Sequence, residues 1–251
     1  MKIYNKSNVG LVRKTNQDWS EIKILNENLV FAIMCDGMGG AAGGDVACRA
    51  AAFCLKSEIE KKFTCSKTED QNSNCINESE MKSFLTKILA QANNEIIKIG
   101  SEQIEIAGLG TTVVIAILIN NILSVAHVGD SRAYILENKE LRQLTNDHSV
   151  VRELMAAQNI TEEEACKFVG KNLLTRAIGT QNAESDFFQM QINPGSKILL
   201  CTDGLTNHVS DKKICEILST DDDIKLIADN LINNANASGG TDNITVALIF
   251  N

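Results

Sequence analysis

The chain has 251 residues, of which 44% are hydrophobic and 22% are charged, and its formal net charge is −8. This length and composition predict one globular domain with a large buried core. The acidic balance and the lack of a lysine- or arginine-rich run argue against nucleic acid or an anionic membrane surface as a partner. No segment resembles a signal peptide or is apolar for long enough to span a bilayer, so a cytoplasmic protein is expected.

The eight cysteines show no metal-binding spacing such as Cys-x2-Cys. Six of them lie within apolar or helical stretches, which favours free thiols in a reducing compartment over a disulfide framework. Only Cys65 and Cys75 lie in a polar segment where a disulfide would form easily.

The N-terminal part of the chain predicts two neighbouring strands that each carry an aspartate at one end. Apolar and polar residues alternate after Asp18 as far as Ile24, a pattern typical of a strand. The apolar run over residues 29–34 predicts a second strand that is buried on both faces and leads to Asp36. Glycines follow from Gly37 onward and allow the backbone to approach a ligand closely. Asp18 and Asp36 are expected to open toward the same rim.

Two interpretations compete for the turn after Asp36. The run from Gly37 to Ala42 matches the GxGxxG/A fingerprint of dinucleotide-binding proteins, with a predicted strand before it and a predicted helix after it. However, an acidic side chain at the mouth of this turn would repel a pyrophosphate, whereas it would bind a divalent metal ion. The sequence therefore favours a metal-binding turn.

Two helices are expected next, over residues 45–62 and from Met81 to Ile99. In the second, apolar residues recur at three-and-four spacing, which predicts one face packed on a sheet. The polar segment between the helices, about residues 64–80, is expected to be an irregular surface insertion.

From Gly110 the periodicity changes to two. Short turns separate the apolar runs and indicate a single antiparallel meander, with strands at residues 113–119, 123–128, 132–136 and 141–144. A doubly wound nucleotide-binding fold would need crossover helices in this region, so the pattern excludes it. Asp130 follows the second of these strands and a glycine.

Residues 148–172 are predicted to form short helices in a flap outside the core. The remainder of the chain repeats the pattern seen at Asp36, since a predicted strand at residues 197–202 leads to Asp203. Asp242 lies just before a final predicted strand at residues 244–250. Helices are expected between them, near residues 211–218 and 222–237. The three histidines, His127, His148 and His208, are interpreted as structural.

Four aspartates thus lie at predicted strand ends beside Gly, Thr or Asn rather than beside a basic residue, with Asp18 close by: Asp36, Asp130, Asp203 and Asp242. Carboxylates that converge in a partly buried site repel one another, and they remain ionised together only if cations lie among them. Oxygen ligands of this kind select Mg2+ or Mn2+. The sequence therefore predicts a metal centre wherever these strand ends meet.

The chain resembles the bacterial metal-dependent protein serine/threonine phosphatases of the type 2C or PPM family, and the resemblance covers nearly all of it. Seven motifs occur in the family's order: Arg13-Lys-Thr-Asn16-Gln17-Asp18, Asp36-Gly37-Met-Gly-Gly40, Gly110-Thr-Thr112, Gly129-Asp130-Ser131-Arg132-Ala-Tyr134, Leu144-Thr-Asn-Asp147-His148-Ser149, Asp203-Gly204-Leu205 and Gly240-Thr-Asp242-Asn243-Ile-Thr-Val.

The resemblance implies an α+β fold, a four-layer αββα sandwich of two antiparallel sheets flanked by helix pairs, formed by residues 1–251 as a single domain. It implies hydrolysis of phosphoserine and phosphothreonine in proteins, with two Mn2+ or Mg2+ ions per site and a weaker third. The implied partners are phosphoproteins, including a serine/threonine protein kinase and its substrates, and a monomer is expected. The alternative is a catalytically weak or inactive regulator of the same fold that binds phosphoproteins.

For the site, the resemblance implies that Asp36 bridges two metal ions. The implied ligands are Asp36, Asp203 and Asp242 at the first metal, the Gly37 carbonyl and water held by Gln17 or Asp18 at the second, and Asp130 with Asp203 at the weaker third. Water bridging the metals would attack phosphorus in line with the leaving oxygen, without a covalent enzyme intermediate. Arg13 would grip the phosphoryl oxygens with its planar fork of donors.

Two positions depart from the family's pattern. Gln17 stands where many members carry Glu, which removes a negative charge near the second metal. Some members place a histidine near the Asp-Gly motif as an acid for the leaving group, whereas Met38 and Ala41 occupy that neighbourhood here. Protonation of the leaving group is therefore assigned to a metal-bound water.

Overall fold

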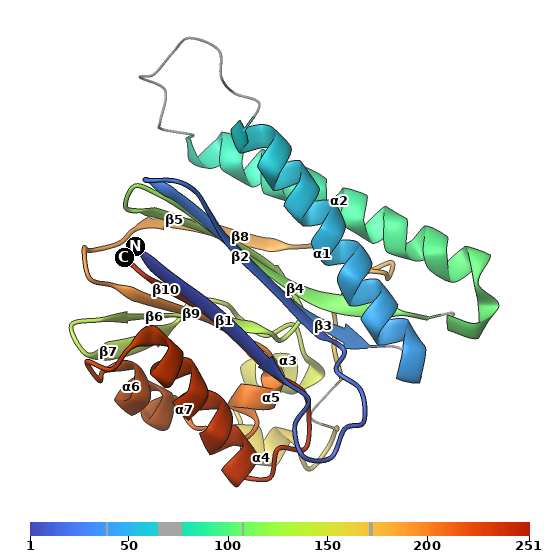
Figure 1. Cartoon of the computed structure of the whole chain (residues 1–251). Coiled ribbons are helices and arrows are strands. Elements are labelled where there is room, and N and C mark those ends of the chain that lie inside the picture. Colours follow the sequence, from blue (N-terminus) through green and yellow to red (C-terminus); the bar gives the residue numbers. More distant parts are fainter. Residues whose placement is uncertain (39, 65–76, 107, 171–172) are drawn as a thin grey trace.

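The computed structural model of the chain describes residues 1–38, 40–64, 77–106, 108–170 and 173–251. Two five-stranded antiparallel sheets pack face to face, and helices cover the outer face of each (Figure 1). This is the four-layer αββα arrangement that the family resemblance implies. Cys65 and Cys75, which lie where a disulfide would form easily, fall outside the described residues, and the six cysteines within them, in line with the sequence analysis, are free.

The first sheet has the strand order β2-β3-β4-β5-β8. Its strands are β2 (Asp18–Asn26), β3 (Leu29–Met38), β4 (Gly110–Ile119), β5 (Ile122–Val128) and β8 (Asp186–Gln191). The second sheet has the order β1-β10-β9-β6-β7. Its strands are β1 (Lys2–Asn8), β10 (Ile244–Phe250), β9 (Lys197–Cys201), β6 (Arg132–Glu137) and β7 (Glu140–Gln143).

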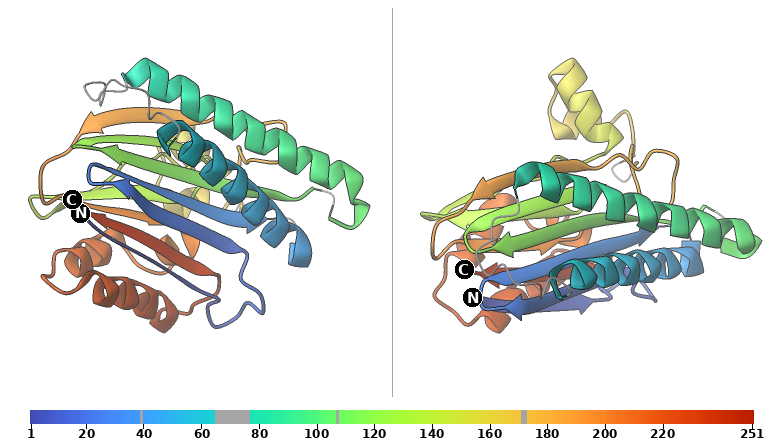
Figure 2. Two further views of the ribbon diagram at one scale, coloured as in Figure 1. Left: turned by 45° about the horizontal axis from the view of Figure 1, so that its top comes forward. Right: turned by 90° about the horizontal axis from the view of Figure 1, so that it is seen from above.

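Seven α-helices and one 3-10 helix are formed by the described residues. They are α1 (Gly40–Thr64), α2 (Glu78–Glu102), η1 (Ile104–Ile106), α3 (Val150–Gln158), α4 (Glu162–Ala165), α5 (Asp203–Thr206), α6 (Asp211–Leu218) and α7 (Ile224–Ala237). Helices α1 and α2 cover the first sheet, and α6 and α7 cover the second (Figure 1). Helices α3 and α4 project from one side of the sandwich (Figure 2). None of the helices in the described ranges has the length and hydropathy needed to cross a bilayer.

Side-chain alternation along the strands separates the core into three layers. On β3, Phe31 and Ile33 pack beneath α1 and α2, whereas Ala32 and Met34 face the opposite sheet. A third layer lies between the second sheet and α5, α6 and α7. Because successive side chains of a strand point to opposite faces, each buried strand contributes to two of these layers, which explains its continuous apolar sequence.

The prediction of a single meander from Gly110 onward is wrong. Strands β4 and β5 pair in the first sheet, but β6 and β7 pair in the second, where β6 lies against β9. The chain changes sheets after β5, where Gly129 has a φ of +108°. Its missing Cβ would lie 2.6 Å from the Thr112 side chain, so only glycine fits this close crossing. The period of two is the same in both sheets and does not reveal the change.

Other boundaries also differ from the sequence analysis. Strands β1 and β8, both at the edge of a sheet, were not predicted: β1 has few apolar residues, and β8 has two adjacent phenylalanines in place of strict alternation. An irregular insertion was expected at residues 64–80. Residues 65–76 are not among the described residues, and residues 78–80 form the first turn of α2. That turn is capped by Asn77, whose side chain accepts a hydrogen bond from the Glu80 N–H at 2.9 Å. Of the expected flap, residues 171–172 lie outside the description.

Packing of α1 on the first sheet provides a test of this core. Leu55 lies on the inner face of α1 and is fully buried, whereas Phe53 on the same helix is 77% exposed. Leu55→Ala should lower the free energy of unfolding by about 2–5 kcal/mol, because it removes apolar contacts and leaves a cavity. Phe53→Ala should change it by less than about 0.5 kcal/mol. Urea unfolding followed by circular dichroism measures both, and equal losses would contradict this packing.

Candidate metal centre

One end of the space between the sheets collects carboxylates. Asp36 follows Met34 in the series of β3 side chains that face the opposite sheet. Asp18 pairs with Asp36 across β2 and β3, so both carboxyls lie on the same face of the first sheet. From the second sheet, Thr202 and Thr245 point toward them and donate hydrogen bonds to Asp18. The two sheets therefore enclose this end from both sides.

The predicted site residues surround a cleft of about 540 Å³ at this end. The residues that line it include Arg13, Gln17, Asp36, Gly37, Asp130, Asp203, Asp242 and Asn243. They come from segments separated by up to 230 residues, and the structure brings them to one cleft. Asp18 is the exception, since it is not among the lining residues.

Asp18 lies beneath the cleft and is only 8% exposed. One of its oxygens, Oδ2, accepts both threonine hydrogen bonds, at 2.9 Å from Thr202 and 2.7 Å from Thr245. Burial raises the pKa of Asp18 to about 7, because these hydrogen bonds offset only part of the loss of water. The other oxygen, Oδ1, accepts neither of these two bonds.

Three further carboxyls, those of Asp36, Asp130 and Asp203, also have raised pKa values in the absence of cations. Burial raises the pKa of Asp36 well above its ordinary value, and the charges of Asp18 and Asp203 raise it further. Burial and the charge of Asp203 raise the pKa of Asp130 to about 8. The pKa of Asp203 is raised by burial and by Asp242, although hydrogen bonds from Asp36 and Asn207 oppose the rise. A divalent cation would remove the repulsion that causes these shifts, so this set of oxygens fits Mg2+ or Mn2+.

Asp242 has a basic partner, contrary to the sequence analysis. The Arg13 Nη2 group donates a hydrogen bond to Asp242 Oδ2 at 2.7 Å, and about half of the Arg13 side chain is exposed. This carboxylate raises the pKa of the guanidinium. The pair could not be found from local sequence, because its members lie 229 positions apart.

Asn243 is a positioning residue that the sequence analysis did not identify. Its Nδ2 group donates hydrogen bonds to the carbonyls of Val9 and Thr15, each at 3.0 Å, and its Oδ1 accepts one from the Gln17 N–H at 2.8 Å. The side chain thereby closes the loop that carries Arg13. The available signal was its place directly after Asp242 in the seventh motif.

Gly37 must be glycine because the backbone is crowded at the floor of the cleft. An added Cβ would lie 2.2 Å from the carbonyl oxygen of Gly44 and 2.8 Å from that of Gln17. The Gly37 N–H donates to the Gln17 carbonyl at 3.1 Å, which joins the two segments beside Asp18 and Asp36. This close approach explains the glycine after Asp36 without a bound nucleotide, and the antiparallel sheets confirm that the dinucleotide-binding fold is absent.

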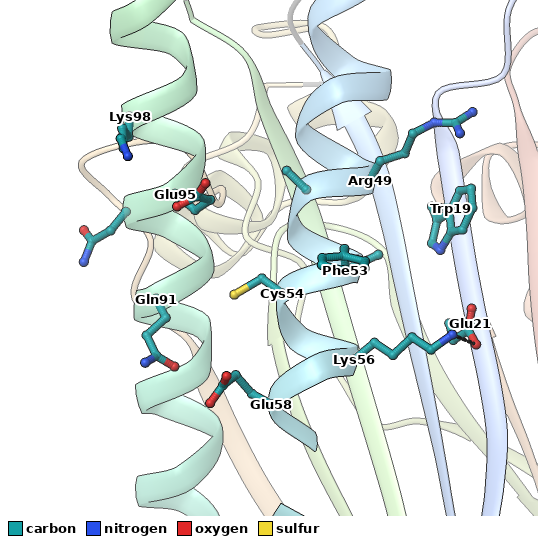
Figure 3. A pocket seen from close by; sticks show the side chains of 13 residues that line it. Trp19, Glu21, Arg49, Phe53, Cys54, Lys56, Glu58, Gln91, Glu95 and Lys98 are labelled. Atoms are coloured by element: carbon teal, nitrogen blue, oxygen red, sulfur yellow. Dashed lines mark hydrogen bonds and ion pairs between the residues drawn. The ribbon is translucent and has the colours of Figure 1, made fainter. Parts of the chain in front are cut away.

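A second hollow, of about 960 Å³, lies on the outer surface between α1, α2 and β2. Figure 3 shows Arg49 near Trp19, and Lys56 joined to Glu21 across this hollow. The Lys56 Nζ lies 2.7 Å from Glu21 Oε1, so this carboxylate is already paired with a cation. The hollow is lined by as many basic residues, Arg49, Lys56 and Lys98, as glutamates, Glu21, Glu58 and Glu95, so it lacks the excess of carboxylates that distinguishes the aspartate cleft.

A third cluster joins His127, His148 and Asp186, whose possible ligand atoms lie within 4.8 Å of one another. The two imidazole rings are stacked, with centroids 4.5 Å apart and an interplanar angle of 19°. Lone pairs in stacked rings lie in nearly parallel planes and do not converge on one ion. In addition, Arg176 Nη1 lies 2.9 Å from Asp186 Oδ1 and already supplies a positive charge. This geometry favours a structural role for both histidines.

Comparisons with known proteins agree with the fold. The model of the family described as Protein phosphatase 2C matches residues 12–243. The serine/threonine phosphatase stp of Listeria monocytogenes serotype 4b (strain F2365) is 38% identical over 241 residues, which cover 96% of this chain and 92% of that protein. The serine/threonine phosphatase structure of S. agalactiae has a TM-score of 0.87 at 32% identity, covering 99% of this chain and 98% of that one. The catalytic domain of the serine threonine protein phosphatase PstP in complex with 2 manganese ions has a TM-score of 0.79 at 30% identity, covering 98% and 96%.

The raised pKa values predict how stability depends on pH when metal is removed. In EDTA, Asp18 and Asp130 have folded-state pKa values of about 7 and about 8, whereas an aspartate in an unfolded chain has a pKa of about 3.9. The folded state therefore binds protons more tightly than the unfolded state, and its stability should fall as pH rises from about 4 to about 8. The melting temperature in EDTA should accordingly be lower at pH 8.5 than at pH 5.5.

Mn2+ should reduce this fall, because cations hold the carboxylates ionised in the folded protein. Asp130→Asn should also reduce it in EDTA, since one of the groups with a raised pKa is removed. Scanning fluorimetry at the two pH values, with EDTA or Mn2+, measures each effect. A melting temperature in EDTA that is independent of pH would contradict the electrostatic account.

Proposed function

The chain belongs to the protein phosphatase 2C family and is a metal-dependent serine/threonine phosphatase, and from this premise we propose that it hydrolyses phosphoserine and phosphothreonine at two divalent cations in the aspartate cleft. The observation that carries the proposal is the gathering of Asp36, Asp130, Asp203 and Asp242 around one cleft. Among the described residues that line the cleft, Arg13 alone forms an ion pair with one of these carboxylates, that of Asp242. Further positive charge is needed before all four ionise together.

Each ligand has a proposed place. Asp36 would bridge the two cations, Asp203 and Asp242 would complete the first, and the Gly37 carbonyl would contribute to the second. Asp18 and Gln17 would act on the second through water, which suits Asp18 because its Oδ1 receives neither threonine hydrogen bond. The remaining ligand, Asp130, would contribute with Asp203 to a weaker third site.

When bound, the cations would provide a nucleophilic hydroxide at neutral pH and neutralise charge on the phosphoryl oxygens. Arg13 would orient the phosphoryl group, because its contact with Asp242 uses one of its N–H groups and leaves the others for phosphoryl oxygens. No histidine is among the residues that line the cleft. The leaving serine or threonine oxygen would therefore take its proton from water in the open cleft.

The wider setting is also proposed. Residues 1–251 would form a single phosphatase domain, supported by the core layer that both sheets share. The protein would act as a monomer in the cytoplasm and oppose a serine/threonine protein kinase by dephosphorylating the kinase and its substrates. The alternative from the sequence, a catalytically weak or inactive phosphoprotein-binding regulator, becomes the conclusion if the metal-loaded protein shows no hydrolysis.

Substitution of metal ligands tests the site. Asp36→Asn and Asp242→Asn should each lower kcat/KM for a phosphothreonine peptide by more than about 100-fold, because loss of even an outer-shell partner of a metal costs about 10–100-fold. Asp222→Asn, at an exposed position, is the matched control and should retain activity. The wild-type activity should require Mn2+ or Mg2+ and vanish in EDTA. Full activity in either cleft variant would exclude that carboxylate as a ligand.

Arg13→Lys tests the role of the planar fork. Lysine retains the positive charge but cannot form two parallel hydrogen bonds to a phosphoryl group. We expect kcat/KM to fall about tenfold in Arg13→Lys and about 100-fold or more in Arg13→Ala. Steady-state kinetics with p-nitrophenyl phosphate measures both, and full activity in Arg13→Lys would show that only the charge matters.

A further inference from the structure

Two adjacent apolar side chains are exposed beside the proposed phosphate-binding arginine. Leu11 is 68% exposed and Val12 is 64% exposed, and both immediately precede Arg13. Single exposed apolar residues are normal on protein surfaces and need no explanation. A pair of them at the mouth of a charged cleft suggests a surface that another molecule covers.

The loop that carries this pair is fixed, so the two side chains cannot withdraw from solvent. The Leu11 N–H donates to the Gly240 carbonyl at 2.8 Å. Gly10 has a φ of +77°, and an added Cβ there would lie 2.1 Å from the Asp242 carbonyl oxygen. Asn243 closes the same loop through its hydrogen bonds to Val9 and Thr15. The apolar pair is therefore held in register with Arg13 and Asp242.

Another apolar side chain belongs to the same cleft. Val12 and Leu174 both line it, and they come from separate segments of the chain. Leu174 is placed by its bridge to Ser149, and the neighbouring Val150 N–H donates to the Leu173 carbonyl at 2.8 Å. The cleft thus combines a carboxylate-rich centre with apolar side chains from two fixed segments.

We propose that Val12, supported by Leu11 and complemented by Leu174, forms an apolar subsite for the residue next to the phosphorylated serine or threonine. The preferred substrates are then phosphopeptides with an aliphatic or aromatic residue adjacent to the phosphoamino acid. This inference rests on the proposed function, because it assumes that the phosphoryl group lies at Arg13 and the aspartates. Its occupant is the substrate chain, since the subsite is continuous with the cleft where that chain must lie.

Lys14 favours a different residue, an acidic one, beside the phosphorylated serine or threonine. It also lines the cleft, and its positive charge would favour an acidic neighbour. An ion pair formed by a long, exposed side chain is weakened by salt and by the ordering of that side chain, whereas the removal of apolar surface from water is not. The apolar neighbour should therefore be preferred at physiological ionic strength.

The test compares phosphothreonine peptides that differ only at the position before or after the phosphorylated residue, with Leu, Gly or Glu there. For the wild type with Mn2+, kcat/KM for the better Leu peptide should exceed that for the matching Gly peptide by about tenfold. Val12→Thr keeps the side-chain shape but adds a hydroxyl, and it should reduce this ratio to about two. Val12→Ile should retain the ratio. Leu226→Ser, which changes a 47% exposed residue on α7, is the matched control and should also retain it.

Equal hydrolysis of the Leu and Gly peptides by the wild type would overturn the inference, as would a preference for the Glu peptide. A ratio that persists in Val12→Thr would show that Val12 does not form the subsite. Failure of the proposed function gives a different result, in which the wild type hydrolyses neither the peptides nor p-nitrophenyl phosphate. Because the readout is a ratio within one enzyme, a variant with altered total activity still gives an answer.

Discussion

The repulsion between carboxylates at one end of the sandwich is the constraint on which the site depends. Asp18, Asp36, Asp130 and Asp203 all have raised pKa values, because burial removes water that would stabilise their charges and because each lies near another acid. Such an arrangement is unfavourable for a metal-free protein and favourable for one that binds divalent cations. The surrounding fold must therefore hold the acids in place against their mutual repulsion.

The residue type changes along the interface between the two sheets, and the hydroxyl side chains at one end of it hold the acids in place. The centre of the interface is apolar, with Ala32, Met34 and their neighbours. Toward the cleft, threonines replace them: Thr112 accepts a hydrogen bond from the Asp36 N–H at 3.1 Å and contacts the Ser131 hydroxyl at 2.7 Å. From the other sheet, the Thr202 and Thr245 hydroxyls donate hydrogen bonds to the Asp18 carboxylate. Hydroxyl groups thus separate the apolar core from the acids, and they satisfy polar groups that would otherwise be buried without partners.

Local features of the site could be predicted from sequence, whereas features that join distant segments could not. An apolar run that ends in Asp-Gly identifies Asp36 and Asp203 as acids at strand ends, because strand and turn are both encoded locally. The transfer of β6 into the second sheet was missed because alternation specifies a strand but not its partner. The pairing of Arg13 with Asp242 and the role of Asn243 were missed for a related reason, since both depend on the N-terminal loop meeting the start of β10. The resemblance to a family supplied the order of the motifs, but not these contacts.

Chemistry and recognition make different demands on the cleft. A phosphoryl group on serine or threonine is common to every phosphoprotein of this class, so the aspartates and Arg13 would act equally on all of them. Discrimination between substrates must come from residues that contact the part of the substrate next to the phosphorylated residue. These residues must be fixed relative to Arg13 if they are to distinguish one substrate sequence from another. The loop at residues 9–17 meets this requirement, because the bonds of Asn243 that position Arg13 also position Val12. A single anchored loop therefore couples the position of the phosphoryl group to the side chain beside it.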